Sequence, residues 1–323
     1  MITLESLRAP IADELQQFNI RFRESMRSSV ALLNAITSYI VKSKGKQVRP
    51  MFVLLAARTA GAITDATYHA AALVELLHTA TLVHDDVVDD ATLRRGFFSI
   101  NALWKNKAAV LVGDYLLARG LLLSVEHQQY RLLQLVSDAV REMSEGELLQ
   151  MEKARNLQVH EEDYYRIIRK KTASLIAAAC ASGAASAGAS DEATLHMKQF
   201  GEAAGMAFQM KDDVLDFTAA FSGKKAGMDL REKKITLPVL IALQRASAVQ
   251  RRRITTIINE QPDHAAALDE LHQLLQELGA IRYTENKMEE FRQKALAHLH
   301  FFPESVYRTT LADLVEFTIH RNF

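Results

Sequence analysis

The stretch 68–89 reads YHAAALVELLHTATLVHDDVVD, a long apolar run that ends in a cluster of acidic residues. Apolar residues recur through it at helical spacing, and its alanines and leucines favour a helix. The run is apolar all round rather than along one stripe, so we expect it to lie in the middle of a large bundle. The stretch 174–187 has the same character and predicts a second central helix.

Helical spacing extends over most of the 323 residues, while alternating β-branched segments are nearly absent. We therefore predict an all-α fold, a single large helical bundle of about ten or more helices with a central apolar cavity. No linker is long enough to divide the chain, so one domain over 1–323 is expected. Helices are predicted within 31–41, 51–60, 68–86, 108–124, 130–151, 162–187, 191–217 and 237–258, and loops at 94–107, 156–162, 219–234 and 260–264.

Charge and cysteine content exclude several classes of protein. Lysine plus arginine equals aspartate plus glutamate at 39 each, which argues against a nucleic-acid binder because such a protein needs a basic surplus. The single cysteine, Cys180, lies in an apolar run and predicts a buried helix residue rather than a nucleophile. The first residues lack the apolar core of a signal peptide, and charges interrupt each candidate membrane span. A cytoplasmic location is the expectation.

Two motifs of the pattern D-D-x-x-D carry the strongest chemical signal. Crowded carboxylates repel one another, and a helix C-terminus adds further negative charge, so no structural reason explains placing them at the end of apolar helices. A hard cation explains them, because Mg²⁺ takes oxygen ligands and is typically held by one or two carboxylates plus substrate phosphates. The six candidate ligands are Asp85, Asp86, Asp89, Asp212, Asp213 and Asp216.

Basic residues near these motifs would neutralise the remaining phosphate charge. Lys46 and Arg49 lie where a loop runs into a helix with Pro50 in its first turn, a place that favours anions. His78 precedes Asp85 by two helical turns and so shares roughly its face. Taken singly, each lysine or arginine is better explained as a solvated surface charge, and His78 is equally well explained as a satisfied core residue. The other candidates are Arg94, Arg95, Lys171, Lys224 and Lys234.

Taken together, these residues resemble the trans-prenyltransferases, or polyprenyl diphosphate synthases. The match follows the family's order and spacing over nearly the whole chain after about residue 31. It includes G-K-x-x-R-P at 45–50, the first aspartate-rich motif with its double arginine and glycine at 85–96, S-I-N at 99–101, A-V-L-V-G-D at 109–114, K-T-A at 171–173, the run G-x-x-x-G-x-A-F-Q-x-x-D-D-x-x-D at 201–216, and a downstream segment at 223–238.

Some positions depart from the family pattern. Lys44 stands where many members have glycine, Gln47 where many carry a second basic residue, Phe98 where proline is frequent, and Lys233 where glycine is frequent. None of these changes removes a predicted metal ligand. Gln47 leaves one fewer cation in the region that the resemblance assigns to isopentenyl diphosphate.

The resemblance implies a Mg²⁺-dependent, head-to-tail condensation of isopentenyl diphosphate onto an allylic prenyl diphosphate. It also implies roles for individual residues. The six aspartates would hold Mg²⁺; Lys171, Thr172 and Gln209 would stabilise the allylic cation. Arg94, Lys171, Gln209, Lys224 and Lys234 would hold the allylic diphosphate, and Lys46, Arg49, His78 and Arg95 would hold isopentenyl diphosphate.

Product length is expected to be set one helical turn before Asp85, where family members that make short chains resemble one another in placing a bulky aromatic residue. Here Ala80 and Thr81 are both small. One helical turn rises about 5.4 Å, close to an isoprene unit, so the growing tail could pass to deeper layers. We predict a hexaprenyl to octaprenyl product, of the kind used for quinone side chains. Leu117, Leu121 and Leu122 are candidates for the floor of the tail channel or for plain core packing.

Several alternatives stay open. A short-chain farnesyl or geranylgeranyl diphosphate synthase would share the motifs. A non-catalytic partner subunit would be expected to lose aspartates, and both motifs are intact. A terpene cyclase would lack the second motif, and a ligand-free helical scaffold leaves the acidic clusters unexplained. Family members are commonly homodimers, so a homodimer is expected, with transient membrane contact during product release left open.

Overall fold

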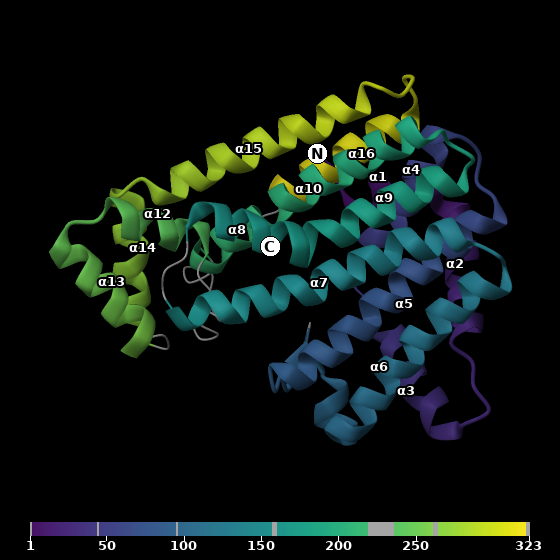
Figure 1. Ribbon diagram of the computed structural model, residues 1–323, viewed down its shortest axis with the longest axis horizontal. Coiled ribbons are helices and arrows are strands. Elements are labelled where there is room, and N and C mark those ends of the chain that lie inside the picture. The colour runs from purple at the N-terminus through teal and green to yellow at the C-terminus, as the bar shows by residue number, and fades with distance from the viewer. Residues whose placement is uncertain are drawn as a thin grey trace. The chain divides into compact units, whose positions relative to one another are not determined.

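The structure is a computed structural model that describes residues 2–43, 45–94, 96–156, 160–218, 236–260 and 264–320. It is almost entirely helical, which confirms the predicted all-α class (Figure 1). The elements are α1 Leu4–Arg8, η1 Ala9–Ile11, α2 Ala12–Ser25, α3 Ala31–Lys42, α4 Val48–Ala60, α5 Asp65–Val88, β1 Leu93–Arg94, β2 Phe97–Phe98, α6 Ile100–Glu126, α7 Tyr130–Asn156, α8 Glu161–Ile168, η2 Arg169–Ala173, α9 Ser174–Ser186, α10 Asp191–Thr218, α12 Leu237–Arg245, α13 Ala248–Glu260, α14 Ala265–Glu277, α15 Ala280–Leu299 and α16 Val306–His320.

The chain divides into two compact units. The first unit is Met1–Val140 with Leu175–Gly201 and His298–Phe317, and the second unit is Arg141–Ser174 with Glu202–Ala297 and Thr318–Phe323. The expectation of one domain over 1–323 stays a prediction.

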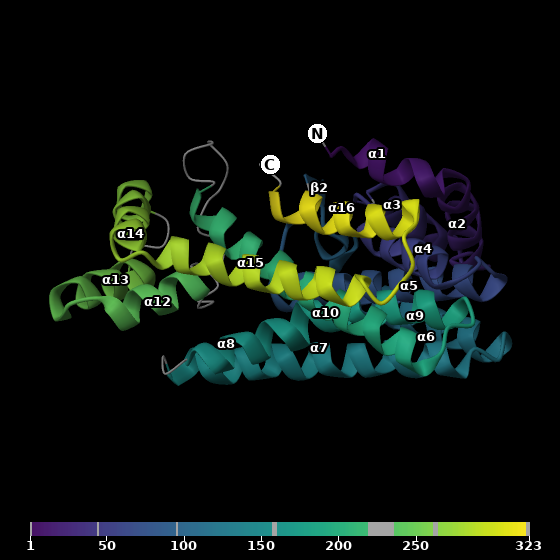
Figure 2. The ribbon, with the colours of Figure 1, turned by 90° about the horizontal axis from the view of Figure 1, so that it is seen from above.

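Helix α5 forms the centre of the first unit and packs along α6 and against α4 (Figures 1 and 2). Its apolar residues Leu73, Val74 and Leu76 are fully buried, and α4 is buried along most of its length. The all-round apolar character of the sequence is therefore matched by burial on several sides. Since this helix ends in the first acidic motif, its packing fixes where that motif lies.

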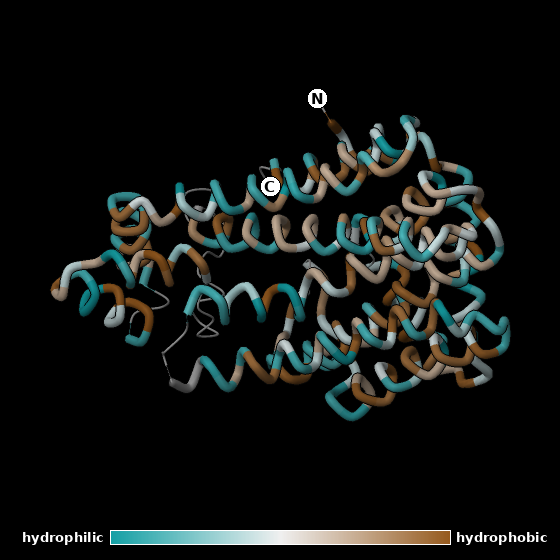
Figure 3. The backbone as a smooth tube through the Cα atoms, turned by 45° about the horizontal axis from the view of Figure 1, so that its top comes forward, coloured by the Kyte–Doolittle hydropathy of each residue, from teal (hydrophilic) through white to brown (hydrophobic). Residues whose placement is uncertain are grey.

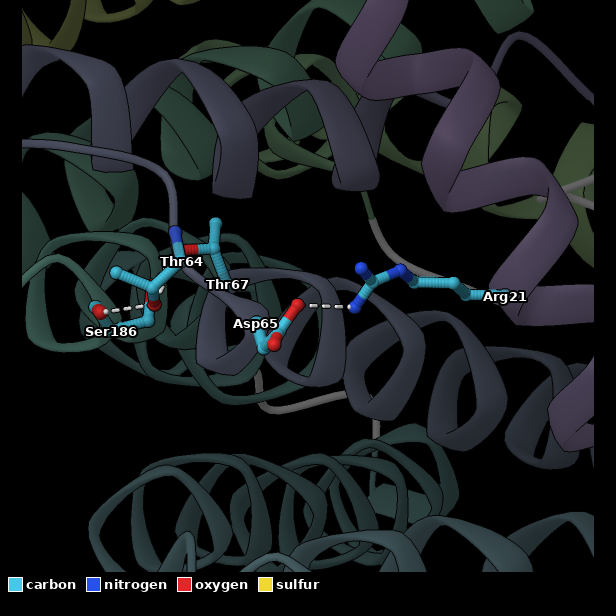
Figure 4. A network of polar contacts seen from close by, with 5 residues as sticks. All are labelled: Arg21, Thr64, Asp65, Thr67 and Ser186. Atoms are coloured by element: carbon cyan, nitrogen blue, oxygen red, sulfur yellow. Dashed lines mark hydrogen bonds and ion pairs between the residues drawn. The ribbon is translucent and has the colours of Figure 1, made fainter.

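The N-terminus of α5 is held by a network of polar contacts (Figure 4). The Thr64 backbone N–H donates to Thr67 Oγ1 at 3.1 Å, and the Thr64 hydroxyl donates to the Ser186 carbonyl of α9 at 3.0 Å. Ser186 Oγ donates to Thr67 Oγ1 at 2.9 Å, and Arg21 of α2 pairs with Asp65 at 2.7 Å. These contacts satisfy part of the helix end and tie α5 to two neighbouring helices.

Helix α6 corrects two expectations. It begins at Ile100, inside the predicted loop 94–107, because Ser99 caps it by accepting a bond from the Ala102 N–H at 3.3 Å; Lys105, with φ of 71°, kinks it. By length and composition alone, α6 is the one helix of the described residues apolar enough to cross a membrane, although we expected charges to interrupt each such run. Core helices of folded proteins meet the same criterion, and α6 packs along α5.

In the second unit, α12, α13 and α14 lie together (Figure 1). The predicted helix 237–258 is wrong as one element, since it breaks between α12 and α13. Ala246 is extended, with φ of −67° and ψ of 143°, and Ser247 Oγ accepts from the Gln250 N–H at 3.3 Å, which caps α13.

Hydrophobic and hydrophilic segments alternate along many of the helices (Figure 3), as expected for amphipathic helices that bury one side. Helix α9 is the exception, because nearly all of its residues are buried. Cys180 lies in it with no exposed surface, and burial raises the pKa of its thiol, which keeps it protonated. This confirms Cys180 as a core residue.

Candidate active site

The first acidic motif occupies the last turn of α5. The Asp89 N–H donates to the Asp85 carbonyl at 2.8 Å, and Asp90, with φ of 49°, lies just beyond the end of the helix. Asp86 is 4% exposed, whereas Asp89 is exposed. The Asp86 carbonyl accepts bonds from Asn101 Nδ2 at 3.1 Å and from the Ala91 N–H at 2.9 Å, so α6 and the following turn fix the motif's backbone.

A cavity lies beside this motif, within the first unit. It brings together two predicted site residues, His78 and Asp86, with Gly45 of the G-K-x-x-R-P segment. Tyr39 of α3 lines it and donates to the Phe98 carbonyl of the β1–β2 hairpin at 2.7 Å. The remaining lining residues are Phe22, Ile40, Ser43, Glu75, Thr79, Leu82, Val83, Phe97, Ser99 and Ile100.

The segment before α4 presents the predicted cations. Lys46 is exposed and Arg49 is half-buried, and Pro50 lies in the first turn of α4 as predicted. Gln47 has φ of 57°, a left-handed conformation that few residues other than glycine adopt, and its Nε2 donates to Asn19 Oδ1 of α2 at 2.8 Å. The residue that departs from the family pattern is thus tied to α2.

The two predicted chain-length residues differ in environment. Ala80 is 2% exposed, and Thr81 is half-buried with its hydroxyl donating to the His78 carbonyl at 2.9 Å. Leu121 and Leu122 of α6 are 39% and 47% exposed, so the expectation that they are plain core residues of the chain is wrong; their role at a channel floor stays a prediction. They belong to an exposed apolar stripe on α6.

The second acidic motif lies at the end of α10, where side chains of the second unit surround its middle carboxylate. Asp213 is 3% exposed. Its Oδ2 accepts from the Tyr164 hydroxyl at 2.6 Å and the Leu237 N–H at 3.4 Å, and its Oδ1 accepts from Gln209 Nε2 at 3.0 Å. Gln209 Oε1 in turn accepts from the Thr172 hydroxyl at 2.7 Å. Three predicted site residues therefore share one hydrogen-bond chain.

Lys171 and Thr172 lie in η2, a π-helical turn between α8 and α9. Such turns are rare in proteins overall, but where they occur they are often at functional sites. The Lys171 ammonium pairs with Glu147 of α7 and lies 3.4 Å from Gln150 Oε1. The Lys171 ammonium therefore already has two side-chain oxygen acceptors.

Two glycines let neighbouring helices approach η2 closely. A Cβ on Gly146 of α7 would lie 2.9 Å from Lys170 Cβ and 3.0 Å from the Lys171 nitrogen. A Cβ on Gly205 of α10 would lie 2.6 Å from Ala173 Cα. Real Cβ atoms are essentially never so close to other atoms, so the turn is packed tightly from both helices.

Some predicted site residues cannot be placed. Arg95, Lys224 and Lys234 lie outside the described residues, and only the backbone of Arg94, in β1, is described. Within the described ranges, no three aspartate, glutamate, histidine or cysteine side chains form a group that could hold a metal ion. The candidate ligands are all carboxylates, and this fits Mg²⁺, which uses one or two carboxylates together with phosphate oxygens and water.

Sequence reasoning missed Tyr164, Glu147, Gln150 and Tyr39. Tyr164 precedes Lys171 by seven residues, two helical turns, the same spacing that drew attention to His78 before Asp85. That signal was available for Tyr164. Glu147 and Gln150 lie on a different helix, and only the fold brings them to Lys171.

An all-helical fold with two D-D-x-x-D motifs and a K-T-A segment defines the class of this protein, the trans-prenyltransferases. The family model described as polyprenyl synthetase matches residues 30–275, and the chain belongs to this family. It is 36% identical over 323 residues to the octaprenyl diphosphate synthase of Escherichia coli, covering 99% of this chain and 100% of that one. It is 37% identical to an all-trans-nonaprenyl-diphosphate synthase of Rhodobacter capsulatus, covering 98% of each chain.

Solved structures agree with the sequence relatives. The crystal structure of a decaprenyl diphosphate synthase from Rhodobacter capsulatus matches with a TM-score of 0.93 and 35% identity over 98% of each chain. A polyprenyl synthase from Caulobacter crescentus, complexed with calcium and isoprenyl diphosphate, matches with a TM-score of 0.91 and 35% identity, covering 99% of this chain and 98% of that one.

Proposed function

We propose that this trans-prenyltransferase condenses isopentenyl diphosphate onto an allylic prenyl diphosphate and releases a long-chain all-trans polyprenyl diphosphate. The observation that carries the proposal is the intact pair of acidic motifs in a chain aligned end to end with an octaprenyl diphosphate synthase. In the reaction the allylic C–O bond breaks and pyrophosphate leaves. The double bond of isopentenyl diphosphate then forms the new C–C bond, and a proton is lost to the pyrophosphate.

The chief physical demand is stabilisation of the charge that develops on the leaving group. Bound divalent cations would supply positive charge there, held by the six aspartates of the two motifs. Calcium in the Caulobacter crescentus relative supports a bound divalent cation in this family. Among the chain's own groups, the Lys171 ammonium would exchange Glu147 for the allylic diphosphate. Thr172 and Gln209 would orient their dipoles toward the allylic cation, in a geometry that their shared hydrogen bond fixes.

The first unit would hold isopentenyl diphosphate. Lys46, Arg49 and Arg95 would bind its diphosphate, and His78 would contact it from the buried face of α5. The cavity that His78 lines combines apolar and polar groups, as a small prenyl diphosphate requires. Arg94, Lys224 and Lys234 would complete the allylic diphosphate site.

Product length would be set at Ala80 and Thr81. Relatives that make heptaprenyl, octaprenyl and nonaprenyl chains support a long product. Thr81→Phe places an aromatic ring at a half-buried position, and it is therefore a cleaner test than the fully buried Ala80. We expect the variant to stop at farnesyl or geranylgeranyl diphosphate, measured by chromatography of radiolabelled products. An unchanged product would remove Thr81 from the chain-length role.

The decisive experiment incubates purified protein with farnesyl diphosphate, isopentenyl diphosphate and Mg²⁺ and sizes the products. We expect hexaprenyl to octaprenyl diphosphate, with no product in excess chelator. A product no longer than geranylgeranyl diphosphate would favour the short-chain alternative. Absence of any product from the folded chain would favour a partner subunit that needs a second chain.

We also propose that the enzyme is a homodimer, with Mg²⁺ as its cofactor and the cytoplasm as its location. An exposed apolar stripe on α6 supports self-association, since large apolar patches mark contact surfaces. Sedimentation equilibrium should give a dimer, and Leu111→Glu should weaken it; a monomeric wild-type protein would refute the assignment. Fractionation of cells would test the location and any transient contact with membranes. The stripe comprises Val110, Leu111, Leu121, Leu122 and Val125.

A further inference from the structure

A buried tyrosine contacts the second acidic motif of the second unit, and nothing in the motif's sequence points to it. Tyr164, in α8, is 3% exposed, and its hydroxyl donates a 2.6 Å bond to Asp213 Oδ2. Asp213 is equally buried. A hydroxyl bonded to a carboxylate is among the stronger neutral–charged hydrogen bonds, and exclusion of water strengthens it further.

This bond is one end of a chain of directed contacts. Asp213 Oδ1 accepts from Gln209 Nε2 at 3.0 Å, which turns the other end of the Gln209 amide, its Oε1, toward Thr172. The Thr172 hydroxyl then donates to that oxygen at 2.7 Å. Because Asp213 accepts from the amide nitrogen of Gln209, the amide oxygen is left to accept from Thr172. The orientation of Asp213 therefore determines how Gln209 and Thr172 direct their dipoles.

The position of Tyr164 suits such a role. It comes from α8, which leads directly into the π-turn η2 that carries Thr172. The Leu237 N–H of α12 reaches the same carboxylate oxygen at 3.4 Å. Helices α8 and α12 pack against each other, so Asp213 is held from two elements as well as its own helix.

We propose that Tyr164 is a positioning residue that orients Asp213 and, through it, Gln209 and Thr172. The inference rests on the proposed function and deepens it. In this role Tyr164 acts through the Asp213 carboxylate. Groups that orient metal ligands and their neighbours typically change metal affinity or activity by about 10–100-fold when removed.

The adjacent tyrosine offers a matched control. Tyr165 is half-buried and donates a bond of the same length, 2.6 Å, to a different carboxylate, Glu161 Oε1. Both tyrosines lie in α8. Tyr164→Phe and Tyr165→Phe therefore each remove one hydroxyl that donates to one carboxylate. Only the first affects Asp213.

The two variants are compared with the wild-type enzyme in steady-state kinetics against Mg²⁺ concentration. For Tyr164→Phe we expect kcat to fall about 10–100-fold, with half-saturating Mg²⁺ raised about tenfold and the KM for isopentenyl diphosphate within about twofold. Tyr165→Phe should stay within about twofold throughout. Calorimetric titration of inorganic pyrophosphate in Mg²⁺ should show the same contrast without turnover.

A double-mutant cycle separates positioning from general stability. If Tyr164 acts through Asp213, then Tyr164→Phe should add almost nothing to the loss caused by Asp213→Asn. Three results would overturn the proposal: additive losses of kcat in the cycle, equal losses of kcat in both tyrosine variants, or wild-type Mg²⁺ dependence in a folded Tyr164→Phe. Thermal melting without ligands identifies unfolding. If the melting points shift, the cycle still decides whether Tyr164 acts through Asp213. Failure of the proposed function would instead appear as absent wild-type product.

Discussion

The two acidic motifs have the same sequence pattern but differ in burial. Val88 and Asp89 are exposed at the end of the first motif, whereas Leu215 is buried and Asp216 half-buried at the end of the second. In each, the middle aspartate is buried, at 4% exposure for Asp86 and 3% for Asp213. The Asp86 backbone carbonyl accepts bonds from Asn101 and Ala91, and a turn and a short hairpin follow the motif. Around Asp213 both carboxylate oxygens accept bonds from side chains or the backbone.

The bonds around Asp213 show how a carboxylate of the motif can be oriented before any ligand binds. A carboxylate with several directed donors is preorganised, because its rotation would break those bonds. The first motif has a fixed backbone at a helix end, with Asp89 exposed. We infer that the Asp213 carboxylate is oriented by its neighbours and sensitive to changes in them.

The largest expected effect comes from removing one outer aspartate of either motif. Asp85→Ala and Asp212→Ala should each lower turnover about a thousandfold or more, since metal stabilisation of the leaving group is worth several kcal/mol. Helical content by circular dichroism should change little. Retained activity in both variants would refute the assignment of metal ligands.

The next effect tests the packing around the second motif. Gly205→Ala would drive a Cβ into the backbone of η2, and overpacking of this kind costs about 1–3 kcal/mol in the free energy of unfolding. Displacement of Thr172 by about 1 Å should lower kcat about a hundredfold.

The control for this variant lies in the first unit. The three atoms nearest to a Cβ on Gly113 all belong to the imidazole of His84, the far end of a side chain that is 33% exposed and can move aside. Urea unfolding should therefore show a loss below about 1 kcal/mol for Gly113→Ala. Equal losses for the two alanines would contradict the contrast between the motifs.

A smaller effect is expected from the hydroxyl of Thr172. Thr172→Val removes the donor to Gln209 Oε1 while keeping the shape, and one such bond is worth about 1 kcal/mol. We expect kcat to fall about five- to tenfold. The buried Thr59 of α4, whose hydroxyl donates to the Leu55 carbonyl at 2.8 Å, gives the matched control, and Thr59→Val should leave kcat unchanged.

The smallest effect concerns the segment before α4. Asn19→Ala removes the acceptor that holds the Gln47 amide beside Lys46. The KM for isopentenyl diphosphate should rise about two- to fivefold, which is the range of one lost neutral hydrogen bond near an anion site, while kcat stays constant. A change confined to kcat would place this contact outside the diphosphate site.

Much of the fold could be predicted because its signals are local. The apolar runs of α5 and α9 predicted buried helices, and both are buried. The predicted helix bounds were wrong where one or two residues determine where a helix begins or ends. Ser99 starts α6 earlier than predicted, and the extended Ala246 splits α12 from α13. Capping depends on a single side chain, which periodicity over a long window does not detect.

The helical class and the two acidic triplets follow from the amino-acid sequence alone, because apolar periodicity and residue chemistry are properties of short stretches. The groups that surround the triplets depend on the packing of distant helices. Tyr164 meets Asp213, and Glu147 meets Lys171, through contacts between helices far apart in the chain. No local pattern encodes such a contact, since it depends on how closely the intervening backbones pack.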